Sequence, residues 1–281
     1  MKKIRLLTPG PTPVPERLSL RMARPIVHHR SPEFEAVFGR VREGLGWLFQ
    51  TKQDVLVFAA SGTGAMEAAF VNFLRKGDTA VVVDGGKFGE RWGKFAKAYG
   101  VNAVTLKCEW GHPVDPAAVT SALRENPQAK AVYVQANESS TGVYHPIREL
   151  AQVTAKTGAI LVVDAISALG AMTLPMDEWG IDVLVSAGHK ALGLPPGIAF
   201  LAAGEKAWKL NESADLPAST STSSASAKTS ARTRRRGRPP SRWWKASTSR
   251  SPCSARRAWR TSSRAMNGWP GRRAPACRRW G

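Results

Sequence analysis

The chain has 281 residues and 43% hydrophobic content, which suffices for one large domain or two smaller ones with a substantial core. Its formal net charge is +20, but 15 Arg and 2 Lys fall within residues 218–281, which contain neither Asp nor Glu. Residues 1–217 are therefore close to neutral, as in an ordinary globular protein. The first apolar stretch is too short for a signal peptide and Asp164 interrupts the longest one, so neither a secretory leader nor a membrane-spanning helix is expected.

The cysteine and histidine patterns exclude two further kinds of site. Cys108, Cys253 and Cys277 are odd in number and show no CxxC spacing, which indicates a reducing cytoplasm rather than a disulfide framework. The five histidines show no HxxxH arrangement. We therefore expect a cytoplasmic protein without a metal site.

The first predicted elements are an arm and a helix. Residues 1–20 include the string TPGPTPVP, whose prolines prevent regular structure, so we expect an extended N-terminal arm there. Residues 30–50 are predicted to form an amphipathic helix, because their apolar side chains recur at helical spacing. These side chains are Phe34, Val37, Phe38, Val41, Leu45 and Leu48.

From residue 55 onward, short apolar runs alternate with helical patterns over Gly64–Leu74 and Val119–Pro127. The runs are apolar on both alternations, which favours a largely parallel sheet covered by helices on both faces. The predicted fold class is therefore α/β with a seven-stranded, mostly parallel sheet. The seven strand candidates are Val55–Phe58, Ala80–Val83, Ala103–Leu106, Ala131–Val134, Ile160–Val163, Val183–Val185 and Ile198–Ala202.

This pattern stops after Lys209, and residues 210–281 are predicted to be a disordered basic tail. From residue 218 the tail has no Val, Leu or Ile, so it cannot bury enough apolar surface to offset the entropy of the chain. The tail begins abruptly after Pro217, and it consists mainly of residues that GC-rich codons encode. These two features lead to the hypothesis of a reading-frame shift in a GC-rich gene. The alternative is a polyanion-binding tail, since residues 233–245 and 255–260 interleave basic and aromatic side chains.

The residues Ser61, Gly62 and Thr63 follow the first predicted strand and open the next helix. Small residues, two hydroxyls and a helix N-terminus together form a cup that suits an anion such as phosphate. The simpler alternative is an ordinary N-cap.

Two charged residues follow later strands. Asp164 ends an apolar run, where it either caps a helix beginning at Ile166 or binds the protonated nitrogen of a pyridine ring. Lys190 follows the next strand among glycines and is either a surface lysine or part of the same cofactor site as Asp164. Ligands of open α/β sheets collect at the carboxyl edge, so the combination with the phosphate cup favours a cofactor site.

Five motifs in order carry a family resemblance: SGTGAMEA, DGGKFGERW, ESSTGV, VVDAISALG and SAGHKALGLPPG. Together they resemble the class V aminotransferases that use pyridoxal 5′-phosphate, nearest the alanine–glyoxylate and serine–glyoxylate group, over Leu6–Lys209. The resemblance implies the large domain of a fold-type I pyridoxal-phosphate-dependent transferase over residues 21–209. The small C-terminal domain of that family is not matched.

The resemblance also implies the roles of the central residues. Lys190 matches the lysine that forms the Schiff base with the cofactor and then shuttles a proton. Asp164 matches the acid that keeps the ring nitrogen protonated. Phe88 matches the aromatic position that stacks on the ring, with plain core packing as the alternative.

The remaining cofactor contacts are implied in the same way. Ser61, Gly62 and Thr63 match the phosphate-binding turn, and Ser139 matches the residue near the ring hydroxyl. His189 is a departure, since relatives often have Gln there, but a histidine can also hydrogen-bond a phosphate.

The implied activity is transfer of an amino group from a small amino acid, alanine or serine, to glyoxylate or pyruvate, in a homodimer. Two alternatives remain open. The first is a cofactor-binding but catalytically impaired chain, because the unmatched small domain supplies the arginine that grips the substrate carboxylate in relatives. The second is a relative of the cysteine desulfurases, although neither Cys253 nor Cys277 lies in a convincing setting for that chemistry.

Overall fold

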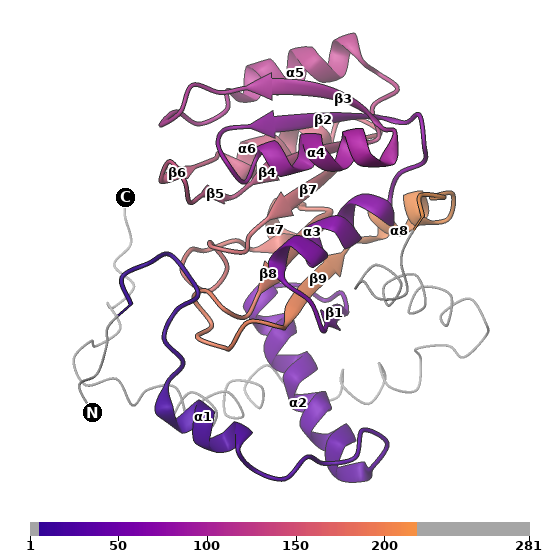
Figure 1. Cartoon of the computed structure of the whole chain (residues 1–281). Helices are drawn as coiled ribbons and strands as arrows, with labels where there is room; N and C mark the ends of the chain where they lie inside the picture. The colour runs from indigo at the N-terminus through magenta and orange to yellow at the C-terminus, as the bar shows by residue number, and fades with distance from the viewer. Residues whose placement is uncertain (1–5, 218–281) are drawn as a thin grey trace. The chain divides into compact units, whose positions relative to one another are not determined.

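The computed structural model describes residues 6–217. Its centre is a seven-stranded sheet with the order β1-β9-β8-β7-β4-β2-β3 (Figure 1). Strand β9 is antiparallel to both of its neighbours, and the pairs from β8 to β3 are parallel. The predicted α/β class and mostly parallel sheet are confirmed. The strands are β1 (Val55–Phe58), β2 (Thr79–Asp84), β3 (Asn102–Lys107), β4 (Ala131–Gln135), β7 (Ile160–Asp164), β8 (Val183–Ala187) and β9 (Ala199–Ala203).

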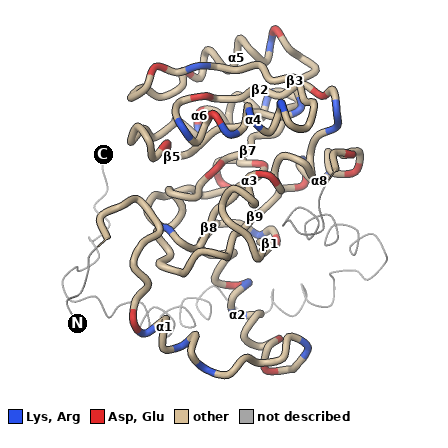
Figure 2. Tube along the Cα trace, viewed as in Figure 1, with Lys and Arg blue, Asp and Glu red and all other residues tan. Residues whose placement is uncertain are grey.

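Five of the seven strands are almost wholly buried, because nearly every residue in them is apolar, whereas the edge strand β3 has no buried residue. In β2, β4, β7, β8 and β9 almost every position is buried on both alternations, as expected for a sheet with two covered faces. Charged residues in this sheet stand only at the last positions of three strands, Asp84, Lys107 and Asp164. Figure 2 shows that the other charged positions lie mainly on helices and connecting loops.

Helices cover both faces of the sheet. The core on one face includes Leu45 of α2, Val119 of α5 and Leu150 of α6. The core on the other face includes Met66 of α3 and Trp92 of α4. The helices are α1 (Glu16–Met22), α2 (Pro32–Phe49), α3 (Gly62–Val71), α4 (Glu90–Tyr99), α5 (Pro116–Glu125), α6 (Ile147–Thr154), α7 (Met176–Trp179) and α8 (Glu205–Asn211).

The helix ends follow local capping chemistry rather than the apolar pattern. Ser31 Oγ accepts a hydrogen bond from the Phe34 amide, so α2 starts at Pro32, within the predicted 30–50. Asp115 caps α5, which therefore begins at Pro116, before the predicted Val119–Pro127. Helix α3 ends at Val71, three residues earlier than predicted.

Three features differ from the sequence-based prediction. Helix α1 occupies Glu16–Met22, so the described part of the arm is irregular only up to Pro15. The folded body continues past Lys209, since α8 ends at Asn211 and Leu216 is 1% exposed. A small hairpin of β5 (Asn137–Glu138) and β6 (Val143–Tyr144) was not predicted, because two-residue strands leave no pattern.

The predicted disordered tail, from residue 218 on, lies outside the described residues. Within residues 6–217, no helix combines the length and apolarity needed to cross a membrane.

Candidate active site

The candidate residues follow strands that end at one edge of the sheet. Strands β2, β4, β7 and β8 are parallel, and β1 runs in the same direction because both it and β8 are antiparallel to β9. Their carboxyl ends therefore share an edge, which is where ligands of open α/β sheets bind. Every predicted site residue lies at the end of one of these strands or in the segment that follows it.

The turn after β1 forms the N-terminus of α3. Ser61 Oγ accepts a hydrogen bond of 3.3 Å from the Gly64 amide, so the N-cap that was the simpler alternative is present. A Cβ added at Gly62 would lie 2.6 Å from Ile166 Cδ1. Glycine therefore lets this turn lie against the Ile166 side chain, which would have to shift to admit a Cβ.

Asp164 is 5% exposed at the end of β7. Its Oδ1 accepts a 2.8 Å hydrogen bond from the Ile166 amide, but turns rather than the helix considered as an alternative follow it. Burial raises the pKa of this carboxyl from 3.8 to about 7, while the Ile166 N–H and the positive charges of Arg91 and Lys190 oppose the rise. Both cations are therefore near the carboxyl group.

Lys190 is half-buried beyond β8. Burial lowers the pKa of its amine, Asp164 opposes this effect, and the positive charge of Arg91 adds to it. Among charged lysines at a protein surface such a shift is unusual, and it increases the fraction of neutral, nucleophilic amine.

The N-terminal arm packs over the Lys190 loop, a contact that the sequence did not predict. Thr12 Oγ1 donates to the Lys190 carbonyl at 2.7 Å, and the Thr12 amide donates to the His189 carbonyl at 3.1 Å. A Cβ at Gly10 would lie 2.5 Å from Lys190 Cδ and 2.8 Å from its Nζ. The string TPGPTPVP was read as irregular, which is correct, but nothing in it indicated this partner.

Arg91, near the start of α4, was missed as a site residue. Its Nη1 donates to Thr63 Oγ1 at 2.9 Å, and its guanidinium carbon lies 4.6 Å from the centroid of the Phe88 ring. Arg91 therefore links the turn at α3 to the predicted stacking residue and acts electrostatically on Asp164 and Lys190. The available signal was its place three residues after Phe88, within the motif DGGKFGERW.

The other predicted residues lie close to this group. Phe88 is half-buried in the loop between β2 and α4. Ser139 lies in the turn of the β5–β6 hairpin, but its neighbour Ser140 makes the hydrogen bond to that loop, accepting from the Lys87 amide at 3.0 Å. His189 Nδ1 is buried without a hydrogen-bond partner in the described part of the chain.

The structure thus joins Thr63, Phe88, Asp164 and Lys190 through Arg91, with Ser61 and Gly62 on the adjoining turn. Ser139 is connected only through its neighbours in the hairpin. Among residues 6–217 no group of three His, Cys, Asp or Glu side chains could hold a metal ion.

Known proteins resemble this chain in sequence and in fold. The family model "Aminotransferase class-V" matches residues 17–240, past the Lys209 limit of the motifs. The small subunit of a soluble hydrogenase from Synechococcus sp. (strain PCC 6716) is 44% identical over 219 residues, which cover 76% of this chain and 57% of that protein. The serine–glyoxylate aminotransferase of Hyphomicrobium methylovorum is 36% identical over 213 residues, covering 74% and 53%.

Among solved structures, a ureidoglycine–glyoxylate aminotransferase from Bacillus subtilis matches with a TM-score of 0.72 and 28% identity, covering 76% of this chain and 55% of that one. The chain spans little more than half the length of these relatives. The family model nevertheless covers most of the sequence, and the fold agrees with that of the solved relative. On these grounds the chain belongs to the class V aminotransferase family.

Proposed function

We propose that this chain acts as a pyridoxal-phosphate-dependent aminotransferase that moves an amino group from alanine or serine to glyoxylate or pyruvate. The observation that carries the proposal is the convergence of Asp164, Lys190 and Thr63 around Arg91 at one edge of the sheet. The names of two relatives, a serine–glyoxylate and a ureidoglycine–glyoxylate aminotransferase, support glyoxylate as the acceptor.

The residues present fit pyridoxal phosphate. A phosphate suits the positive N-terminal end of α3, the Thr63 hydroxyl and the Arg91 guanidinium, because all three are donors or positive. A protonated ring nitrogen suits the Asp164 carboxylate, which is buried and otherwise costly to ionise. The buried, unpartnered Nδ1 of His189 fits an added polar group beside Lys190.

The chemistry follows from two shifted groups. Pyridoxal phosphate, when bound, supplies an electron-withdrawing ring that stabilises negative charge at the α-carbon of the amino acid. The Asp164 carboxylate would hold a proton on the ring nitrogen through a charge-assisted hydrogen bond. The lowered pKa of Lys190 leaves its Nζ neutral more often, and a neutral amine would be able to hold the cofactor and to accept the α-proton of the amino acid.

The test uses the full chain loaded with pyridoxal phosphate. We expect a yellow absorbance band, borohydride reduction that fixes the cofactor on the peptide containing Lys190, and pyruvate formation from alanine plus glyoxylate. Lys190→Ala should remove the covalent adduct and lower turnover by roughly 10⁴-fold or more. Lys94→Ala is the matched control, since this lysine is exposed and pairs with Glu90 on α4.

The outcomes separate the possible functions. A wild-type chain without the band, or a band unchanged by Lys190→Ala, would contradict the proposal. Cofactor attached to Lys190 without turnover of alanine or serine would support the catalytically impaired alternative instead.

We also propose a homodimer, supported by the apolar side chains that the N-terminal segment exposes. In the first part of α2 the rings of Phe34 and Phe38 stack with centroids 5.8 Å apart, and Phe38 is exposed. Large exposed apolar surfaces in globular proteins mark association sites. The exposed residues of this segment are Leu6, Leu7, Leu20, Met22, Ile26, Val27, Val37, Phe38, Val41 and Trp47.

Sedimentation equilibrium tests the dimer. The wild-type chain should sediment as a dimer, and Phe38→Glu should shift it to the monomer. Trp110→Glu is the control, because Trp110 is also exposed but lies outside this segment. A monomeric wild-type chain would exclude the homodimer.

A further inference from the structure

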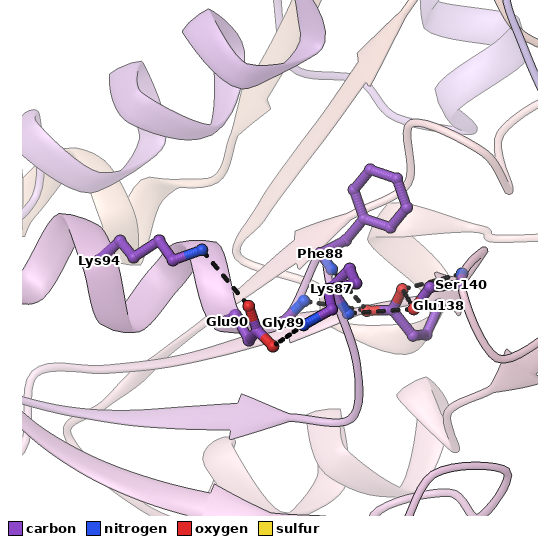
Figure 3. Close-up of polar contacts among 7 residues, drawn as sticks. All are labelled: Lys87, Phe88, Gly89, Glu90, Lys94, Glu138 and Ser140. Atoms are coloured by element: carbon purple, nitrogen blue, oxygen red, sulfur yellow. Dashed lines mark hydrogen bonds and ion pairs between the residues drawn. The ribbon is translucent and has the colours of Figure 1, made fainter.

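Glu138 is a buried carboxylate with a dense set of hydrogen bonds. It is 0% exposed, in strand β5. Its Oε2 accepts from the amides of Phe88 and Gly89 at 3.1 and 2.9 Å. Its Oε1 accepts from the Ser140 amide at 3.1 Å and from the Ser140 hydroxyl at 2.7 Å (Figure 3).

These contacts fasten the loop between β2 and α4 to the β5–β6 hairpin. Besides Glu138, the Ser140 Oγ accepts from the Lys87 amide at 3.0 Å, so three consecutive amides of the loop bind the hairpin. A Cβ at Gly86 would lie 2.5 Å from Ser140 Oγ and 2.7 Å from Glu138 Cγ. The loop therefore needs glycine at position 86 to let the carboxylate approach.

The loop carries Phe88, and Figure 3 shows its ring pointing away from the carboxylate while its backbone is held. The guanidinium of Arg91 lies over that ring. A backbone fixed at two successive amides leaves the Phe88 side chain only its own torsions to vary. Glu138 thus fixes the position of the Phe88 backbone, and with it the position of the ring, without contacting the ring itself.

We propose that Glu138 is a positioning residue of the site, which holds Phe88 in the place where it stacks on the cofactor ring. This inference rests on the proposed function, because it requires a cofactor ring at this edge.

The chemistry of the position favours a carboxylate. All four neighbours are donors, and an ionised carboxylate offers only acceptors, with about four lone-pair sites. Glutamine has almost the same shape, but its amide nitrogen brings two donors that would face donors of the loop or of Ser140. Glu138→Gln therefore breaks part of the network with little change in volume.

The test is a double-mutant cycle between Glu138 and Phe88 in the full chain. The measurements are the dissociation constant for pyridoxal phosphate, the induced circular dichroism of its absorbance band, and the unfolding of the cofactor-free protein. Glu138→Gln should weaken cofactor binding by about tenfold, the low end for residues that position a ligand contact through a neighbour, and reduce the induced dichroism. Glu149→Gln is the control, since that carboxylate is exposed on α6.

In a Phe88→Ala background the same Glu138→Gln change should alter the dissociation constant by less than about twofold, because the ring through which Glu138 acts is gone. Equal losses in both backgrounds, or no loss in the wild-type background, would overturn the proposal. If Glu138→Gln does not fold, the cycle is run with Ser140→Ala, which removes the hydroxyl that bridges Glu138 and Lys87. That variant should show a smaller loss with the same dependence on Phe88, and a loss independent of Phe88 would again overturn the proposal.

The wild-type chain separates the two possible failures. If it binds no cofactor at Lys190, the proposed function fails. If it does bind and the cycle shows no coupling, only the role of Glu138 fails.

Discussion

Burial has opposite effects on stability in the interior of the sheet and at its carboxyl edge. Strand β7 contains residues of both regions. Its first four residues, Ile160–Val163, are apolar and fully buried within the two cores. Its last residue, Asp164, is almost as buried but ionisable. The interior gains stability from burial, whereas the edge loses some, because burial disfavours the charged forms of its groups.

The same cost occurs at Lys190, where burial is the main cause of the lowered pKa. A group that burial destabilises persists in a fold when it serves binding or catalysis. The comparison therefore predicts that fold stability and cofactor chemistry depend on different residues and respond differently to mutation.

The largest expected change in stability comes from the interior. Leu150 on α6 is fully buried in the core on one face of the sheet, so Leu150→Ala should lower the free energy of unfolding by about 2–5 kcal/mol. At a temperature where the variant is folded, its affinity for pyridoxal phosphate should match that of the wild-type chain. Urea denaturation and cofactor titration measure the two effects.

Gln152→Ala is the matched control, because Gln152 is exposed on the same helix α6, and its stability should stay within about 0.5 kcal/mol of the wild-type value. An equal loss in both variants would contradict the assignment of stability to the sheet interior. Weak cofactor binding by folded Leu150→Ala would contradict the separation of the two regions.

At the edge, a mutation that makes Asp164 neutral should raise the free energy of unfolding at neutral pH, whereas the mutation in the interior lowers it. The folded chain raises the pKa of Asp164 from 3.8 to about 7, so the stability from this group is complete below 3.8 and is lost as the pH rises through about 7. In the cofactor-free protein the free energy of unfolding should therefore fall by up to about 1.4 kcal/mol per pH unit across that window. Asp164→Asn should remove this slope and weaken cofactor binding by roughly tenfold or more, since it loses a charge-assisted hydrogen bond.

Denaturant titrations of the cofactor-free protein at about pH 5 and pH 7 measure the slope. Asp115→Asn is the control, because it changes an exposed carboxylate at the N-cap of α5, and this variant should keep the pH slope of the wild-type chain. A slope that survives Asp164→Asn would show that other groups dominate the pH dependence.

The sequence predicted the interior better than the edge, and the reason is physical. The strands are short, mostly apolar runs that recur between helical patterns and turn residues, and this alternation located all seven. The helix ends were less accurate because single caps such as Asp115, rather than the apolar pattern, decide them.

At the edge, the motifs identified residues but not the contacts between them. Arg91 and Glu138 lie inside the matched motifs DGGKFGERW and ESSTGV, yet their partners Thr63 and Phe88 are 28 and 50 residues away in the chain. The arm gave even less indication, because the hydrogen bond from Thr12 to Lys190 spans 178 residues. Such contacts depend on tertiary packing, which short-range patterns do not encode.

The smallest predicted effect tests whether packing at the edge, as well as charge, is specific. Gly62→Ala places a Cβ 2.6 Å from Ile166 Cδ1, so either the Ile166 side chain or the turn at α3 must shift. We expect a loss of about 1–3 kcal/mol in stability, as for other overpacked sites, together with weaker cofactor binding. Ile166→Val removes the Cδ1 atom and should restore most of both properties in the double variant. If the second change restores stability without restoring binding, the turn itself requires glycine, and the close approach to Ile166 is a matter of packing alone.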